Sequence, residues 1–162
     1  MPYSYSFYKD EIAAMLKGEI EPLDRVLDVG AGAGTYARLL PTIKMDCLEI
    51  HKPYVKRFHL GQFYQKIHIG DIRTFDFDYY TYLIMGDVLE HLTFAEARAV
   101  LDRAALHRVM VAVPYRFEQG EWEGNEFETH HQPDLTPELM KQRYPELKLQ
   151  FGDDNYGYYT NY

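Results

Sequence analysis

Apolar and polar positions alternate along the chain in two recurring patterns. Short apolar runs predict buried strands over residues 25–29, 44–50, 66–69, 80–85 and 108–113. Between these runs the apolar residues have helical spacing, which predicts helices over residues 8–17 and 35–40, after Pro53, from Thr93 and from Thr136. Strands that alternate with helices predict an α/β fold with a doubly wound, mostly parallel sheet.

Two helix starts and the C-terminal part of the chain carry local signals. Thr93 and Glu96 form the T-x-x-E pattern of a capping box, and Thr136 precedes Pro137 at a second helix start. Residues 147–151 and 156–162 flank the turn sequence GDDN. This arrangement predicts a C-terminal hairpin that adds one antiparallel strand at the edge of the sheet.

Length and composition are those of one globular domain spanning residues 1–162. The apolar fraction of 46% supports a core, and no apolar run reaches the roughly 18 residues that a membrane span needs. The first residues, MPYSYSFYKDE, lack the basic and apolar segments of a signal peptide. The single cysteine, Cys47, has no partner for an internal disulfide, and its neighbours predict a buried strand thiol. We expect a cytoplasmic protein without a membrane partner.

The charge balance narrows the range of partners. Lys and Arg together number 17 against 25 Asp and Glu, a net charge of −8, and the basic residues are scattered. Proteins that grip a nucleic-acid backbone concentrate basic residues to replace counterions. We therefore expect no long nucleic-acid partner, whereas a single nucleotide or an RNA end stays compatible with this charge.

The sequence VLDVGAGAGTYARLL reads as a strand, a glycine turn and the start of a helix. Gly30, Gly32 and Gly34 let the backbone turn sharply and approach a ligand, and a helix N-terminus favours polar ligand groups. The dinucleotide fingerprint G-x-G-x-x-G does not fit, because Thr35 occupies the place of its last glycine. The loop therefore predicts a nucleotide-like ligand without identifying it.

Three acidic residues near predicted strand ends narrow the choice of ligand. Asp28 beside the glycine turn would repel a pyrophosphate and favour an ammonium group. Glu49, at the end of the second strand, is placed to accept both ribose hydroxyls. Asp71 follows the third strand, where it can accept from an adenine amino group while Ile72 packs on the ring. A ligand with ammonium, ribose and adenine but no phosphate is S-adenosylmethionine.

In these motifs the chain resembles the class I S-adenosylmethionine-dependent methyltransferases. DVGAGAG is similar to their first motif, LEI to their acidic second-strand end, GDI to their adenine contact, and GDVLEHL to the motif that closes the fourth strand. The resemblance implies a Rossmann-like methyltransferase fold. It also implies that the cofactor-binding residues are Asp28, Gly30, Ala31, Gly32, Glu49, Ile50, Asp71, Ile72 and Asp87.

The segment MGDVLEHL adds a second kind of chemistry. Asp87, Glu90 and His91 have the spacing i, i+3 and i+4, which places them on one face if the segment is a helical turn. Two carboxylates and an imidazole can hold a divalent ion, and His130 and His131 lie in the long segment after the fifth strand.

This acid-x-x-E-H turn resembles that of the ubiquinone-pathway O-methyltransferases and of the enzymes that methylate small-RNA 3′ ends. The resemblance implies a Mg²⁺ or Mn²⁺ site with Asp87, Glu90 and His91 as ligands and His130 or His131 as the fourth. Asp87 departs from the glutamate that is usual in those families. Without a metal, the catalytic residues are expected to be His91, as general base, and Glu90.

Two segments are expected to face the acceptor. We expect residues 1–22 to form an N-terminal helical lid. We expect residues 115–135 to form an acceptor-side loop that carries Trp122. The acidic composition of this loop suits neutral or amine acceptors and disfavours phosphorylated or carboxylated ones. The 15 tyrosines allow two readings, strand and half-buried surface positions or a stacking wall for the acceptor. The terminal hairpin also offers an edge for pairing between subunits in a homo-oligomer.

Together these features predict a methyltransferase that acts on a hydroxyl of a small molecule or glycan precursor. Two alternatives remain open at this stage. One is a methyltransferase-like binding module without turnover, and the other is a methyltransferase of an RNA 3′ end.

Overall fold

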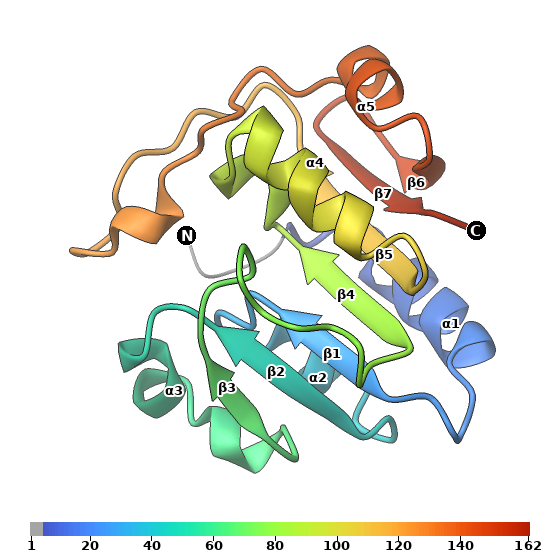
Figure 1. Cartoon of the computed structure of the whole chain (residues 1–162), viewed down its shortest axis with the longest axis vertical. Helices are drawn as coiled ribbons and strands as arrows, with labels where there is room; N and C mark the ends of the chain where they lie inside the picture. The colour runs from blue at the N-terminus through green and yellow to red at the C-terminus, as the bar shows by residue number, and fades with distance from the viewer. Residues whose placement is uncertain (1–4) are drawn as a thin grey trace.

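The computed structural model describes residues 5–162. One sheet has the strand order β3-β2-β1-β4-β5-β7-β6 (Figure 1). The strands are β1 (Val26–Val29), β2 (Met45–Glu49), β3 (Ile67–Ile69), β4 (Tyr82–Gly86), β5 (Arg108–Pro114), β6 (Lys148–Gly152) and β7 (Tyr156–Thr160). The α-helices are α1 (Lys9–Glu19), α2 (Thr35–Leu39), α3 (Pro53–Arg57), α4 (Phe94–Arg103) and α5 (Pro137–Arg143), and the 3-10 helices are η1 (Leu60–Gln62), η2 (Leu89–His91) and η3 (Glu126–Glu128).

Strands β1 to β5 are parallel, and β6 and β7 form the predicted hairpin. One detail of the prediction is wrong: the antiparallel strand does not lie at the edge. Strand β7 pairs antiparallel with β5 on one side and with β6 on the other, so β6 is the edge strand. Burial explains this order, because every residue of β7 is buried whereas β6 is mostly exposed.

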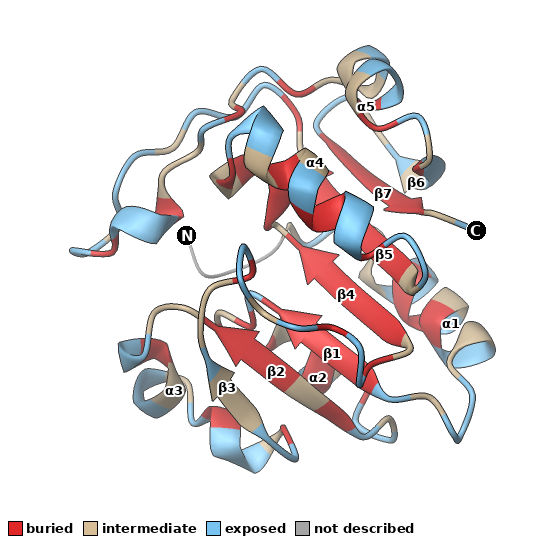
Figure 2. Ribbon diagram, viewed as in Figure 1, coloured by how far each residue is buried: buried red, intermediate tan, exposed pale blue. Residues whose placement is uncertain are grey.

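The sheet separates two apolar cores, one on each face. Figure 2 shows that the central strands are buried, whereas the helices are partly exposed. Helices α1 and α2 cover one face, where Ile12, Leu16 and Tyr36 pack on alternate residues of the strands. Helices α4 and α5 cover the other face with Val100, Met140 and their neighbours. Since both faces are covered, the strands read as continuous apolar runs in the sequence.

The connection between β3 and β4 contains no helix. Phe77 and Tyr80 in this irregular segment are buried in the same core as α4, and Phe75 packs against them. The segment therefore covers its part of the sheet with aromatic side chains instead of a helix.

The helix starts follow the sequence signals. Thr93 and Glu96 form a capping box at α4, and the Thr136 side chain accepts a hydrogen bond from the amide of Leu139 at α5. Cys47 is buried, as predicted, and burial raises the pKa of its thiol. No helix within residues 5–162 is long and apolar enough to cross a membrane.

The N-terminal segment is described from Tyr5 onward, so the part of the predicted lid that contains Tyr3 lies outside the described residues. Helix α1 itself packs on the sheet, with Ile12 and Leu16 buried in the core. A covering role for residues 1–22 stays a prediction.

Candidate functional site

A cavity of about 640 Å³ opens at the carboxyl ends of the parallel strands. This is the edge at which open α/β sheets bind ligands, and the volume is within the usual range for small-molecule sites. The glycine turn after β1 forms one side. Gly30 and Gly32 have φ values of 67° and 50°, which residues with side chains rarely adopt. A Cβ on Gly30 would also lie 2.8 Å from Cγ2 of Val88, so the turn depends on glycine there.

Glu49 lies where β2 ends, against the glycine turn. One carboxylate oxygen accepts a 2.8 Å hydrogen bond from the amide of Gly32, and the other accepts a 2.7 Å bond from the amide of His51. Its side chain lines the cavity although the residue is only 3% exposed. Burial raises the pKa of this carboxyl, while the two amides favour its ionised form.

The end of β3 supplies the next part of the wall. Asp71 and Ile72 line the cavity beside Ile50. The Arg73 guanidinium binds the carboxylate of Asp71 and also reaches Glu96 at the start of α4. The hydrogen bonds from Arg73 lower the pKa of Asp71, so this carboxylate is ionised at neutral pH.

Asp28 does not reach the cavity. Its side chain is 1% exposed, and its carboxylate accepts a hydrogen bond from the hydroxyl of Tyr64 beneath the glycine turn. Burial raises the pKa of Asp28 to about 7, although the Tyr64 bond opposes this. The prediction that Asp28 contacts a cofactor ammonium directly is therefore wrong for this geometry, because a ligand cannot touch a carboxylate that is sealed from solvent.

The turn after β4 differs from the predicted helical turn. Asp87 has a φ of 56° and precedes η2, so it does not share a face with Glu90 and His91. Its carboxylate accepts a 2.6 Å hydrogen bond from the hydroxyl of Tyr156 on β7. Asp87 lines the cavity, as expected of a cofactor-binding residue, but it lies outside the group with metal-ligand spacing within residues 5–162.

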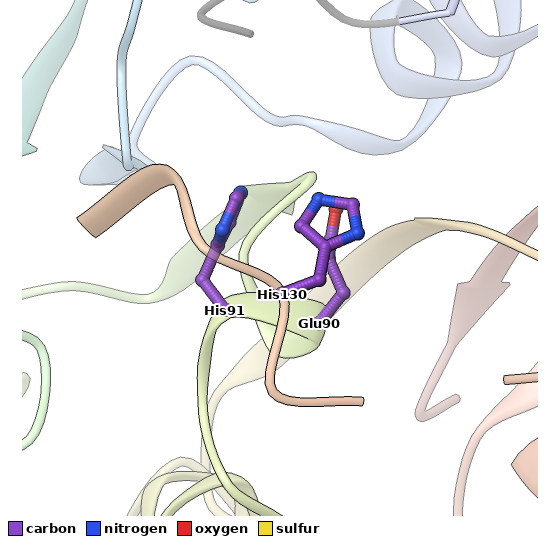
Figure 3. Close-up of side chains that lie close together, drawn as sticks. All are labelled: Glu90, His91 and His130. Carbon is purple, nitrogen blue, oxygen red and sulfur yellow. The ribbon is translucent and has the colours of Figure 1, made fainter. Parts of the chain in front are cut away.

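That group consists of Glu90, His91 and His130, which converge from η2 and from the segment after β5 (Figure 3). One ligand atom from each lies within 4.8 Å of the others. His91 also lines the cavity and His130 does not, and the centroids of the two rings are 4.7 Å apart. Three of the four predicted metal ligands are thus brought together, and Asp87 is not.

Hydrogen bonds fix the tautomers of the two histidines. Nδ1 of His91 lies 3.3 Å from the carbonyl of Thr129, and Nδ1 of His130 lies 2.8 Å from the carbonyl of Phe117. A carbonyl only accepts, so each Nδ1 carries the proton and each Nε2 offers a lone pair. Burial lowers the pKa of His91 to about 4, which keeps the ring neutral at pH 7.

Glu90 is buried between these rings and the core. Its Oε2 has no hydrogen-bond partner among the described residues, and burial raises the pKa of its carboxyl well above the usual value. A buried carboxyl oxygen without a partner is unfavourable unless a cation or a donor approaches it. Glu90 does not line the cavity, so its predicted catalytic role has to act through the histidines.

The segment of residues 115–135, drawn in orange tones in Figure 1, supplies residues to one side of the cavity. Its residues 125–129 and His131 line the cavity. Glu128 anchors the segment, because it accepts a 2.8 Å hydrogen bond from the Tyr54 hydroxyl on α3. Trp122 pairs with Asn125 through a β-bridge and does not line the cavity.

No protein-family model matches the sequence, and no curated protein matches it. Solved structures share its fold. Magnesium protoporphyrin IX methyltransferase from Synechocystis PCC 6803 with bound SAH has a TM-score of 0.64 and 15% identity over 94% of this chain and 80% of that chain. Human N-acetylserotonin methyltransferase in complex with SAM has a TM-score of 0.64 and 14% identity, over 95% of this chain and 51% of that chain. The PH0226 protein from Pyrococcus horikoshii OT3 has a TM-score of 0.63 and 13% identity, over 96% of this chain and 91% of that chain.

The chain has the fold of the class I S-adenosylmethionine-dependent methyltransferases. The chain spans about half of the length of the human enzyme. Sequence identities this low support a shared fold and nothing more.

Within this methyltransferase fold, most predicted cofactor-binding residues lie together. Eight of the nine line one cavity: Gly30, Ala31, Gly32, Glu49, Ile50, Asp71, Ile72 and Asp87. The sequence did not single out Tyr36 or Tyr54, which line it too. Tyr36 directly follows the glycine turn and could have been found from that position. Tyr54 comes from a segment without a motif, and only the fold brings it to the cavity.

Proposed function

We propose that the protein is an S-adenosylmethionine-dependent methyltransferase that acts on a hydroxyl group of a small molecule or glycan precursor. The observation that carries the proposal is a single cavity that contains both a nucleoside-type wall and a neutral histidine. The glycine turn, Glu49 and the apolar Ile50 and Ile72 form that wall, and His91 faces the same space.

The residues present fit S-adenosylmethionine. Glu49 is held by two backbone amides at the ribose position, and Asp71 and Ile72 stand at the adenine position. Bound there, the cofactor supplies an electrophilic methyl group on a sulfonium. The glycine turn brings backbone amides close to the ligand without side chains in the way.

The task left to the protein is to orient the acceptor and remove its proton. Nε2 of His91 carries a lone pair toward the cavity, because its Nδ1 proton is directed to the Thr129 carbonyl. His91 is therefore placed to accept the hydroxyl proton. The segment of residues 115–135 lines one side of the same space.

A divalent ion fits the group of Glu90, His91 and His130. The Oε2 of Glu90, which has no hydrogen-bond partner within residues 5–162, and the rings of His91 and His130 form a donor set of one carboxylate and two imidazoles, which favours Mn²⁺ over Mg²⁺. Such an ion would lower the pKa of an acceptor hydroxyl. Nε2 of His91 cannot bind an ion and accept a proton at once, so the two roles are alternatives.

The lining of the cavity bears on the acceptor. Glu126 and Glu128 stand on the loop side, and the guanidinium of Arg73, which also lines the cavity, is already paired with Asp71 and Glu96. Phosphorylated and carboxylated acceptors would be repelled there. Neutral polyols, sugars and phenols fit this wall.

Cofactor binding tests the central claim. Calorimetric titration should show that the wild-type protein binds S-adenosylmethionine and that Glu49→Gln weakens binding by about tenfold, because one ionised acceptor for the ribose hydroxyls is lost. Glu21→Gln, on the surface, is the control and should bind like the wild type. The absence of binding by the wild type would contradict the proposal. Binding without release of S-adenosylhomocysteine across a mixed acceptor panel would instead make the protein a binding module.

Metal binding separates the two roles of His91. In the absence of cofactor, titration with Mn²⁺ should release heat in the wild type and not in His130→Ala, which removes one of the three grouped ligands. Asp87→Ala should retain the signal, because Asp87 lies outside the group. A wild-type protein that gives no signal would rule out the metal site and leave His91 as the base.

A further inference from the structure

The segment between β5 and α5 leaves the sheet and returns to almost the same place. The amide of Arg116 donates a 2.9 Å hydrogen bond to the carbonyl of Leu135, and the amide of His130 donates a 2.8 Å bond to the carbonyl of Gln119. Residues 119–130 therefore form a loop whose two ends lie close together, as in an Ω-loop. We call residues 119–130 the strap.

The base of the strap is fastened to η2. The amides of His131 and Gln132 donate hydrogen bonds of 2.8 Å and 3.1 Å to the carbonyl of Glu90. The Gln132 side chain adds bonds of 2.9 Å and 3.1 Å to the carbonyls of Leu89 and Leu92, and Gln132 is only 3% exposed. Because these bonds are shielded from water, this end of the strap is fixed to the wall that η2 forms.

The other end of the strap contacts α3 through side chains. The Tyr54 hydroxyl donates a 2.8 Å hydrogen bond to Oε1 of the buried Glu128, and Arg57 forms an ion pair with Glu123. The side chains of Arg57 and Glu123 are about half exposed, so their ion pair contributes little. The shielded bond between Tyr54 and Glu128 is therefore the stronger of these two links.

The strap contributes nothing to the packing of the sheet. Neither apolar core contains a residue of the strap, whereas Tyr115 and Leu135 on either side of it are buried in one of them. A segment without core contacts opens locally at a lower cost in free energy than the elements around it. The closed position of the strap therefore depends mainly on the bonds at its two ends.

The link to α3 lies next to the contact that orients His91. Glu128, which binds Tyr54, is followed directly by Thr129, whose carbonyl lies 3.3 Å from Nδ1 of His91. All four residues line the cavity. A movement of Glu128 away from α3 would move the Thr129 carbonyl as well, because one planar peptide unit joins the two residues. A contact of 3.3 Å is at the long end of the hydrogen-bond range, so a small movement breaks it.

We propose that Tyr54 is a positioning residue for His91. Through Glu128 it holds the strap closed against α3, and the closed strap presents the Thr129 carbonyl to Nδ1 of His91. The proton then stays on Nδ1, and Nε2 keeps its lone pair. When the bond between Tyr54 and Glu128 opens, the ring loses this acceptor and either nitrogen can carry the proton. The inference rests on the proposed function, in which His91 uses the lone pair on Nε2.

NMR of the imidazole nitrogens tests the proposal in the protein without cofactor and with a chelator present, because the two tautomers have different nitrogen shifts. In the wild type, His91 should be protonated mainly at Nδ1. Tyr54→Phe should lower the ratio of this tautomer to the other by about fivefold, the weight of one ordinary hydrogen bond. His91→Ala identifies the signals that belong to His91.

Matched variants separate positioning from a general effect on structure. Glu128→Ala should lower the ratio as Tyr54→Phe does, whereas Glu128→Gln keeps an acceptor for the Tyr54 hydroxyl and should retain most of the ratio. Tyr79→Phe, on an exposed ring before β4, is the control and should change nothing. Trp122 is the single tryptophan and lies on the strap, so its indole signal should shift in Tyr54→Phe and not in Tyr79→Phe.

Three results would overturn the proposal. The first is a wild-type His91 that is protonated mainly at Nε2, the second is an unchanged ratio in both Tyr54→Phe and Glu128→Ala, and the third is an equal loss in Tyr79→Phe. Calorimetric titration of the same wild-type preparation with S-adenosylhomocysteine tests the proposed function separately. If no binding is found, the proposed function fails, and the tautomer ratio still decides whether Tyr54 positions His91.

Discussion

Replacing His91 by alanine should lower turnover by about 10²- to 10⁴-fold, the usual contribution of a positioned acid or base. The dissociation constant of S-adenosylmethionine should stay within about twofold of the wild-type value. The expectation rests on His91 itself, which lines the cavity and whose Nδ1 donates to the Thr129 carbonyl, so that its Nε2 carries the lone pair. Single-turnover kinetics and calorimetric titration of the same preparation measure the two quantities.

The size of the effect does not depend on which role His91 has. As a base it removes the acceptor proton, and as a ligand it positions an ion with Glu90 and His130. His59→Asn is a suitable control, because His59 is exposed at a positive φ that asparagine tolerates. A loss of cofactor affinity as large as the loss of turnover would refute the assignment, since His91 would then serve binding alone.

The alternation of elements was readable from the sequence because it depends on local patterns. Strands buried on both faces give continuous apolar runs, and the caps at Thr93 and Thr136 mark helix starts within a few residues. The position of β7 between β5 and β6 was not readable. The position of β7 depends on the long-range strand pairing that buries its tyrosines. No local sequence pattern predicts that pairing.

The same distinction explains the errors at the site. Spacing placed Asp87 on one face with Glu90 and His91, but the positive φ of Asp87 breaks the turn before η2 begins. Spacing also placed both Asp28 and Glu49 beside the glycine turn. Glu49 is the last residue of its strand and reaches the amide of Gly32, whereas Asp28 lies one residue deeper and is bound by Tyr64. The partner of Asp28 comes from a distant segment that the sequence does not connect with it.

The burial of Asp28 should make the stability of the protein depend on pH. Its pKa in the folded protein is raised to about 7 from an ordinary value of 3.8. Between these values the folded state holds a proton that the unfolded state has released. The contribution of Asp28 to the free energy of unfolding is therefore fully present below about pH 4 and is lost as the pH rises through 7. The loss amounts to up to about 4 kcal/mol.

Asparagine at position 28 isolates this contribution, because it stays neutral at every pH and its amide oxygen can accept from Tyr64. Urea unfolding from pH 4 to pH 8 should show that Asp28→Asn gains stability relative to the wild type by up to about 4 kcal/mol across that range. Glu90 titrates in both proteins, whereas Glu49 is coupled to Asp28, because its charge helps to raise the pKa of Asp28 and is therefore part of the measured difference. The control is Asp154→Asn, in the exposed turn before β7. Its free energy of unfolding should differ from that of the wild type by the same amount at every pH. A constant difference for Asp28→Asn would mean that Asp28 is ionised throughout, with the Tyr64 bond outweighing the cost of burial.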